Sequence, residues 1–204
     1  MQNNNENTLL EVRKAYRLLF DYQARVLDLI SFISGSFGFD YNGGYPKFSN
    51  SGPNNGRGNL GLWAWDWLNM YYYEFNFQPK LVDKDKLYFS IFILNDTGYF
   101  QANKKSKMSK TAVDAFDSPE NSGTKLIFAV GKNTWNGWGS NWDNEEFILQ
   151  NEGNKGLDAK KMVFKSYSLS KFFNEDDAII MLKDFENYCE KFNITFKYQE
   201  KKIK

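Results

Sequence analysis

The chain has 204 residues, of which 42% are hydrophobic and 18% aromatic, enough to bury the core of one domain. Its 26 Lys and Arg residues balance 25 Asp and Glu residues, and this balance argues against a protein dominated by non-specific duplex binding. The chain has no histidine and a single cysteine, Cys189, which excludes an intrachain disulfide, zinc sites of Cys/His type and His-based catalytic dyads.

The first predicted element is a long amphipathic helix that follows an Asn-rich tail at residues 1–7. Residues 8–11 fit a capping box, so we expect the helix to run from Leu9 to about Ser34. Its apolar stripe recurs at spacings of three and four: Leu9, Val12, Tyr16, Leu19, Val26, Ile30 and Ile33. The stripe fits either packing on a sheet or a dimer seam, and we favour the sheet because Gln23 interrupts the pattern.

Residues 35–61 form a Gly- and Asn-rich segment that holds eight of the 15 glycines. Its end, residues 56–61, matches the pattern GxGxxG. A dinucleotide site needs a strand before this motif and a helix after it, whereas here a polar loop precedes the motif and a predicted strand follows. We therefore interpret the segment as a loop, from which Arg57 could reach a phosphate or a carboxylate.

The most aromatic stretch is 61–77, where large rings recur at every second residue. They are Trp63, Trp65, Trp67, Tyr71, Tyr73, Phe75 and Phe77. We interpret 61–77 as a strand with one aromatic face, and a buried helix is the alternative. Asp66 and Glu74 would lie about 26 Å apart along such a strand, too far for an acid–base pair. We expect Asp66 to accept hydrogen bonds from backbone or indole groups.

The rest of the chain predicts several strands and a C-terminal helix. The strands are expected at 87–94, 99–100, 125–130, 147–150, 162–169 and 194–198. Asn174 is placed to cap the helix, whose buried stripe includes Cys189, and residues 200–204 form a charged tail. The predicted fold is a single α+β domain over 8–199. It has an antiparallel or mixed sheet of about five strands, with both long helices packed on one face.

A second unusual loop, residues 131–146, carries Trp135, Trp138 and Trp142 among Gly, Asn and Ser. Together with Trp63 or Trp65, these rings could form a stacking platform for a protein, a base or a sugar. The alternative is a hydrophobic lid over the core, since one tryptophan buries about 200 Å². We expect any exposed members of this group to form the contact surface.

A run of lysines is the candidate phosphate or RNA contact. It consists of Lys104, Lys105, Lys107 and Lys110. The alternative is a solvated loop whose charge is neutralised by Asp114, Asp117 and Glu120. No cofactor or metal is predicted, although a magnesium–carboxylate site stays open. The polar start of the chain and the lack of a long apolar run predict a cytoplasmic protein without a membrane span.

These observations favour a non-enzymatic interaction protein. The compact, histidine-free chain, with its composition rich in Asn, Lys, Phe, Tyr and Ile, resembles the small inhibitors that phages and mobile elements carry against CRISPR effectors. The likeness lies in general character over the whole chain. It implies as partner a large effector protein, such as an RNA-targeting one, or its guide RNA complex. The alternatives are a carbohydrate- or ligand-binding module that uses the Trp-rich loops, and a magnesium-dependent enzyme whose carboxylates converge in the fold.

Overall fold

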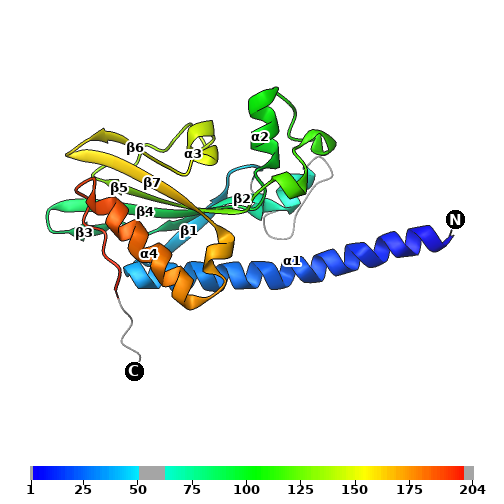
Figure 1. Ribbon diagram of the computed structural model, residues 1–204, viewed down its shortest axis with the longest axis horizontal. Helices are drawn as coiled ribbons and strands as arrows, with labels where there is room; N and C mark the ends of the chain where they lie inside the picture. The colour runs from blue at the N-terminus through cyan, green and yellow to red at the C-terminus, as the bar shows by residue number, and fades with distance from the viewer. Residues whose placement is uncertain (1, 51–62, 200–204) are drawn as a thin grey trace.

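A computed structural model describes residues 2–50 and 63–199, which form layers on both sides of one antiparallel sheet (Figure 1). The strands are β1 (Tyr41–Pro46), β2 (Tyr72–Phe77), β3 (Lys80–Val82), β4 (Asp85–Leu94), β5 (Lys125–Lys132), β6 (Glu152–Leu157) and β7 (Lys160–Ser168). Their order is β1-β2-β4-β5-β7-β6, and β3 pairs with β4 beside this path. The predicted α+β fold is confirmed, with more strands than the five expected.

The helices lie at both ends of the chain and in the connections between strands. They are α1 (Gln2–Phe37), α2 (Gly98–Lys105), α3 (Glu145–Leu149) and α4 (Glu175–Glu190). Short 3₁₀ helices are η1 (Ala64–Trp67), η2 (Asn69–Tyr71), η3 (Val113–Ala115), η4 (Pro119–Asn121) and η5 (Leu169–Phe172). Asn174 caps α4 as predicted, because its Oδ1 accepts a hydrogen bond of 2.8 Å from the Asp177 amide.

One face of the sheet packs against α4 and the C-terminal half of α1, as the sequence predicts (Figure 1). Alternate residues of the central strand β4 point to this side, including Phe89 and Ile91, because successive side chains of a strand face opposite ways. Ile33 from α1 and Phe185 from α4 meet them and are fully buried.

The opposite face of the sheet is also covered, in line with the alternative interpretation of the Trp-rich loop as a lid. The remaining alternate residues of the central strands β4 and β5, including Phe92 and Ile127, point to this face. They pack under α2, α3 and the loop that carries Trp138. Two buried faces explain why β4 and β5 are apolar at nearly every position, since neither face is solvated.

A buried ion pair joins β2 to the segment after β1. Lys47 Nζ lies 2.6 Å from Glu74 Oε2, and both side chains are nearly inaccessible to solvent. Ser90 on the neighbouring strand donates a hydrogen bond of 2.9 Å to the other Glu74 oxygen. The carboxylate is therefore paired and hydrogen-bonded, as a buried charge requires.

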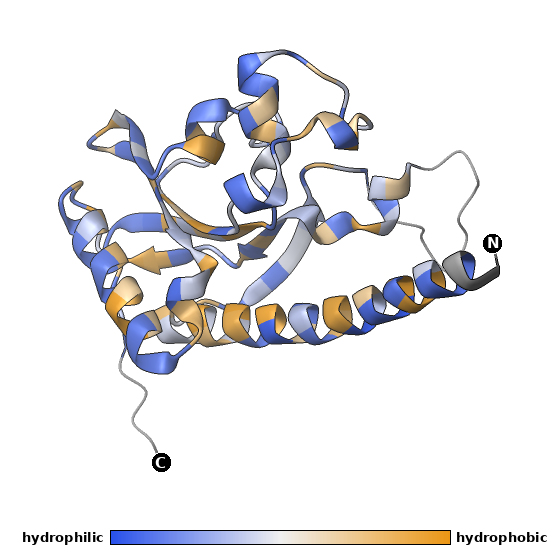
Figure 2. Ribbon diagram, turned by 45° about the vertical axis from the view of Figure 1, so that its right-hand side comes forward, coloured by the Kyte–Doolittle hydropathy of each residue, from blue (hydrophilic) through white to orange (hydrophobic). Residues whose placement is uncertain are grey.

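The N-terminal helix differs from its prediction in length and in packing. It begins at Gln2, so residues 2–7 are helical and Thr8 lies inside the helix, and it continues to Phe37 beyond the expected stop at Gly35. Only the C-terminal half of the stripe packs on the sheet. The N-terminal half projects from the body, and hydrophobic segments recur along it (Figures 1 and 2).

Other sequence predictions are wrong at short elements. Residues 99–100 belong to α2 and residues 147–149 to α3, where strands were expected, and the predicted last strand at 194–198 is irregular. Conversely, β1 lies in the 35–61 segment interpreted as a loop, and β3 and β6 occupy stretches where no strand was predicted. Residues 61 and 62 of the predicted strand over 61–77 lie outside the described residues. Within 63–77 only Tyr72–Phe77 is a strand, and η1 and η2, separated by Leu68, precede it.

Replacing Ile33 with Ala should lower the free energy of unfolding by about 2–5 kcal/mol, because the side chain is fully buried between α1 and the sheet. The matched control is Leu27→Ala on the same part of the helix, which is half exposed and should cost about 0.5 kcal/mol. Urea denaturation of both variants measures the difference. Equal losses would contradict the described orientation of α1.

Candidate interaction surface

Exposed apolar side chains gather at η1 and on the residues beside it, and Trp63 is the one predicted partner-binding residue among them. The side chains of this aromatic patch, as we call it, are Trp63, Trp67, Leu68 and Val113, and each is about half exposed or more. Trp67 is the most accessible of them, with 61% of its surface exposed. Beside them opens an apolar pocket of about 400 Å³, lined by Trp63, Ala64, Trp65, Leu68, Thr111 and Val113.

A buried carboxylate fixes the backbone under the aromatic patch. Asp66, only 1% exposed, accepts a hydrogen bond of 2.8 Å from the Asn50 amide and one of 3.0 Å from the Trp63 amide. The prediction that Asp66 accepts backbone hydrogen bonds is confirmed. The bonds close the turn of η1 and tie it to the chain after β1, so the two exposed indoles stand on a fixed support.

Trp65 and Lys110 tie the other side of the patch to the body. The indole N–H of Trp65 donates 2.8 Å to the Lys110 carbonyl, and the ring packs edge-on against Phe48. Lys110 Nζ in turn donates 2.6 Å to the Phe48 carbonyl and lies 4.4 Å from the centre of that ring. Burial lowers the pKa of the Lys110 ammonium below its ordinary value.

The lysine run does not gather into one open cationic site. Lys105 forms an ion pair of 2.8 Å with Asp117, and Lys107 one of 3.0 Å with Glu145, while Lys110 faces inward. Lys104 is exposed near the end of α2. Three of the four predicted phosphate contacts therefore already have partners within the chain, and the interpretation as a neutralised loop fits better.

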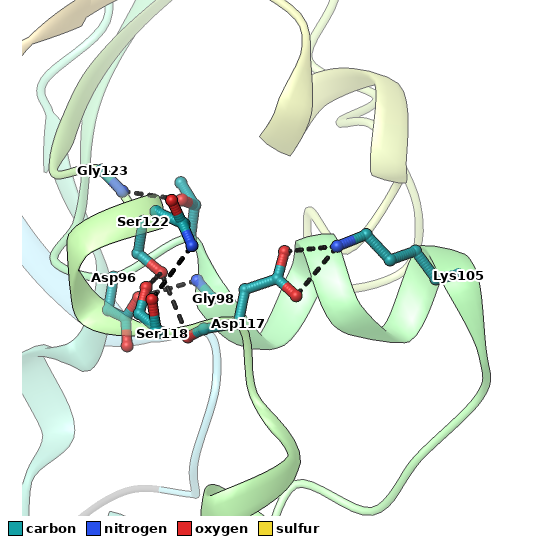
Figure 3. A network of polar contacts seen from close by, with 9 residues as sticks. Asp96, Gly98, Lys105, Asp117, Ser118, Ser122 and Gly123 are labelled. Atoms are coloured by element: carbon teal, nitrogen blue, oxygen red, sulfur yellow. Dashed lines mark hydrogen bonds and ion pairs between the residues drawn. The ribbon is translucent and has the colours of Figure 1, made fainter.

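Figure 3 shows how the segment after the lysine run returns to the start of α2. The Gly98 amide donates 2.7 Å to Asp96 Oδ1, and Ser122 Oγ donates 2.9 Å to the Ser118 carbonyl. At the other end of α2, Lys105 reaches both oxygens of Asp117. These contacts hold the connection that carries Val113 against the body.

The tryptophans of the second loop do not form an exposed platform. Trp138 and Trp142 are each 7% exposed, and Trp138 stacks on Phe147 with 5.5 Å between ring centres. Tyr72 Oη donates 2.8 Å to the Trp142 carbonyl. Trp135 is half-buried and stacks on Tyr88. The assignment of Trp138 and Trp142 to partner binding is corrected: they are the lid, because covering this face of the sheet needs their area.

Two further sequence predictions concern Arg57 in the glycine motif and a magnesium–carboxylate site. Arg57 and the 56–61 glycine motif lie outside the described residues. Within residues 2–50 and 63–199, no group of three or more His, Cys, Asp and Glu side chains is arranged to hold a metal ion. No helix in the same part of the chain combines the length and the apolar character that crossing a bilayer requires.

The fold and the patch define an α+β protein that presents exposed aromatic side chains on a fixed support. The model of the PM0109 protein family matches residues 2–193, and the chain belongs to this family. The matched span includes the whole of α1, the aromatic patch and α4. No curated protein and no solved structure matches the chain.

Replacing single tryptophans with alanine should distinguish the buried lid from the exposed patch by the change in the free energy of unfolding. Trp138→Ala should lower the free energy of unfolding by about 3–5 kcal/mol, because it empties a buried aromatic cluster. Trp67→Ala should change it by about 0.5 kcal/mol, because that ring already faces solvent. Chemical denaturation followed by circular dichroism measures both. A larger loss for Trp67→Ala would mean that the patch belongs to the core.

Proposed function

We propose that this protein is a non-enzymatic interaction protein whose aromatic patch binds a partner protein. The observation that carries the proposal is the exposure of two indoles at the ends of one short 3₁₀ helix: Trp63 precedes η1 and lines an apolar pocket, and Trp67 is the last residue of η1. Tryptophan is the residue type most enriched among binding hot spots, and exposing it without a partner gains nothing for the fold.

The support under the patch favours binding by lowering its entropic cost. Asp66 and Trp65 hold η1 through hydrogen bonds to segments on both sides of it, so the indoles need little ordering when a partner docks. Preorganised contact residues lose less conformational entropy on association, and this raises affinity without additional contacts.

As the particular function we propose inhibition of a nucleic-acid-handling effector, such as a CRISPR nuclease or its guide RNA complex. Apolar side chains dominate the patch, which supports contact with the effector protein over contact with guide RNA. The internal ion pairs of Lys105 and Lys107 point the same way, because RNA would have to compete with Asp117 and Glu145 for them. A sugar-binding role has less support, since Trp138 and Trp142 are buried.

The test is capture of the partner from an extract of the native host, followed by binding measurements with the purified partner. Trp67→Ala should weaken binding by over ~2 kcal/mol, that is, roughly 30-fold or more, while the melting temperature stays within about 2 °C. The control is Phe173→Ala, an aromatic residue beyond η5 that is even more exposed than Trp67, at 80%, and that should leave affinity unchanged.

Two outcomes would contradict the proposal at different levels. Equal affinity of the wild type and Trp67→Ala would remove the patch from the contact surface. A captured partner with no role in nucleic-acid handling, bound through the patch, would contradict effector inhibition and leave the interaction function in place.

A further inference from the structure

The projecting half of α1 is the second exposed apolar feature, and it is separate from the aromatic patch. Every residue from 5 to 21 is exposed over a length of about 25 Å. Leu9, Val12, Tyr16 and Leu19 continue the stripe that packs on the sheet further along the helix, and we call these four residues the seam. A helix rotates by about 100° per residue, so the seam faces the same side as the body.

From this arrangement we propose that the seam pairs two copies of the chain in an antiparallel dimer. The spacing of the seam is symmetric about residue 14. When a second helix runs in the opposite direction, Leu9 of each copy meets Leu19 of the other, and Val12 of each copy meets Tyr16 of the other. A two-fold interface requires this kind of self-complementary pattern.

The position of the body selects the antiparallel direction. The sheet sits on the seam side of α1, and the body begins to contact the helix at Tyr22. A parallel partner would bring its own body to the same end and the same side, where the first body already lies. An antiparallel partner would place the two bodies at opposite ends of the shared helical segment.

A hydrogen bond holds α1 to the body at the residue where the projecting half begins, so its orientation relative to the body is fixed. Tyr22 Oη donates a hydrogen bond to Asn95 Oδ1, and the Asn95 amide group reaches the Met70 carbonyl. Burial raises the pKa of Tyr22 to about 12, so the phenol keeps its proton and remains the donor at physiological pH. Ion pairs within the helix, such as Lys14 with Glu11 at 2.8 Å, add local support.

The exposed area of the seam can be compared with the area that stable protein interfaces bury. Together with Phe20 beside it, the seam exposes on the order of 600 Å² per copy, or ~1,200 Å² for the pair, by ordinary side-chain areas. This is the lower limit for a stable interface, so we expect a dissociation constant in the micromolar range. Arg13 lies beside the midpoint, where Glu6 of the same helix, 4.0 Å away, offsets the repulsion between the two copies.

Sedimentation equilibrium of the full chain between about 1 and 200 µM tests the dimer. The wild type should dimerise, and Tyr16→Asp should raise the dissociation constant at least tenfold, because it places a charge in the seam. Leu10→Asp is the matched control: it adds the same charge to an exposed leucine on the opposite face and should change the constant by less than about threefold. Val12→Asp provides a second seam variant, and circular dichroism confirms folding of each.

Spin-label distances test the direction of pairing, with labels on cysteines introduced at Glu6 or at Lys14, while the native Cys189 is fully buried. In the antiparallel dimer the two labels at position 14 lie level, whereas those at position 6 are separated by about 24 Å along the axis. A monomer at every concentration, equal weakening by Tyr16→Asp and Leu10→Asp, or equal distances at both label positions would overturn the proposal. Partner capture through the aromatic patch is measured separately, so either proposal can fail alone.

Discussion

The rest of the structure depends on one constraint: both faces of the antiparallel sheet must be covered. A sheet of this size with nearly continuous apolar strands cannot leave either face in water. On one side α4 and the C-terminal half of α1 meet this need. On the other side α2 and α3 are too short to do so alone, and Trp138 and Trp142 complete the cover. The aromatic content of the chain is largely explained by this second face.

The aromatic residues that the core does not use are therefore informative. Trp63 and Trp67 are exposed, although they lie next to a cluster that had room for Trp65. Their support includes a fully buried carboxylate, Asp66, which the chain would not need for a solvated loop. The projecting half of α1 follows the same logic, since its seam repeats the apolar spacing that serves the core further along. These two exposed apolar features are the observations on which the two proposals rest.

The sequence was most informative where periodicity was long and most misleading where it was short. The strands around Phe89 and Phe128 and the helix capped by Asn174 were predictable from apolar runs and a capping residue. The stretch from Trp63 to Tyr71 was not, because its alternating rings fit a strand. Asp66 instead closes a 3₁₀ turn through a local bond from the Trp63 amide and a bond from the distant Asn50 amide, which depends on tertiary structure. At α3 a usable signal was present: Asn144 caps the helix through the Glu146 amide. For α1, periodicity predicted the helix and its stripe, but the length of the sheet decides how much of the stripe is buried.

The central claim is that Trp63 and Trp67 form a contact surface, whereas Trp138 and Trp142 belong to the core. Hydrogen–deuterium exchange of the protein, alone and bound to its captured partner, tests this claim most directly. The account predicts that binding slows exchange over residues 63–68 and 111–113, the backbone of the aromatic patch and its neighbours. It also predicts that residues 138–147 exchange slowly in both states, because they close the second core. Fast exchange over 138–147 in the free protein that slows on binding, with no change at 63–68, would contradict it.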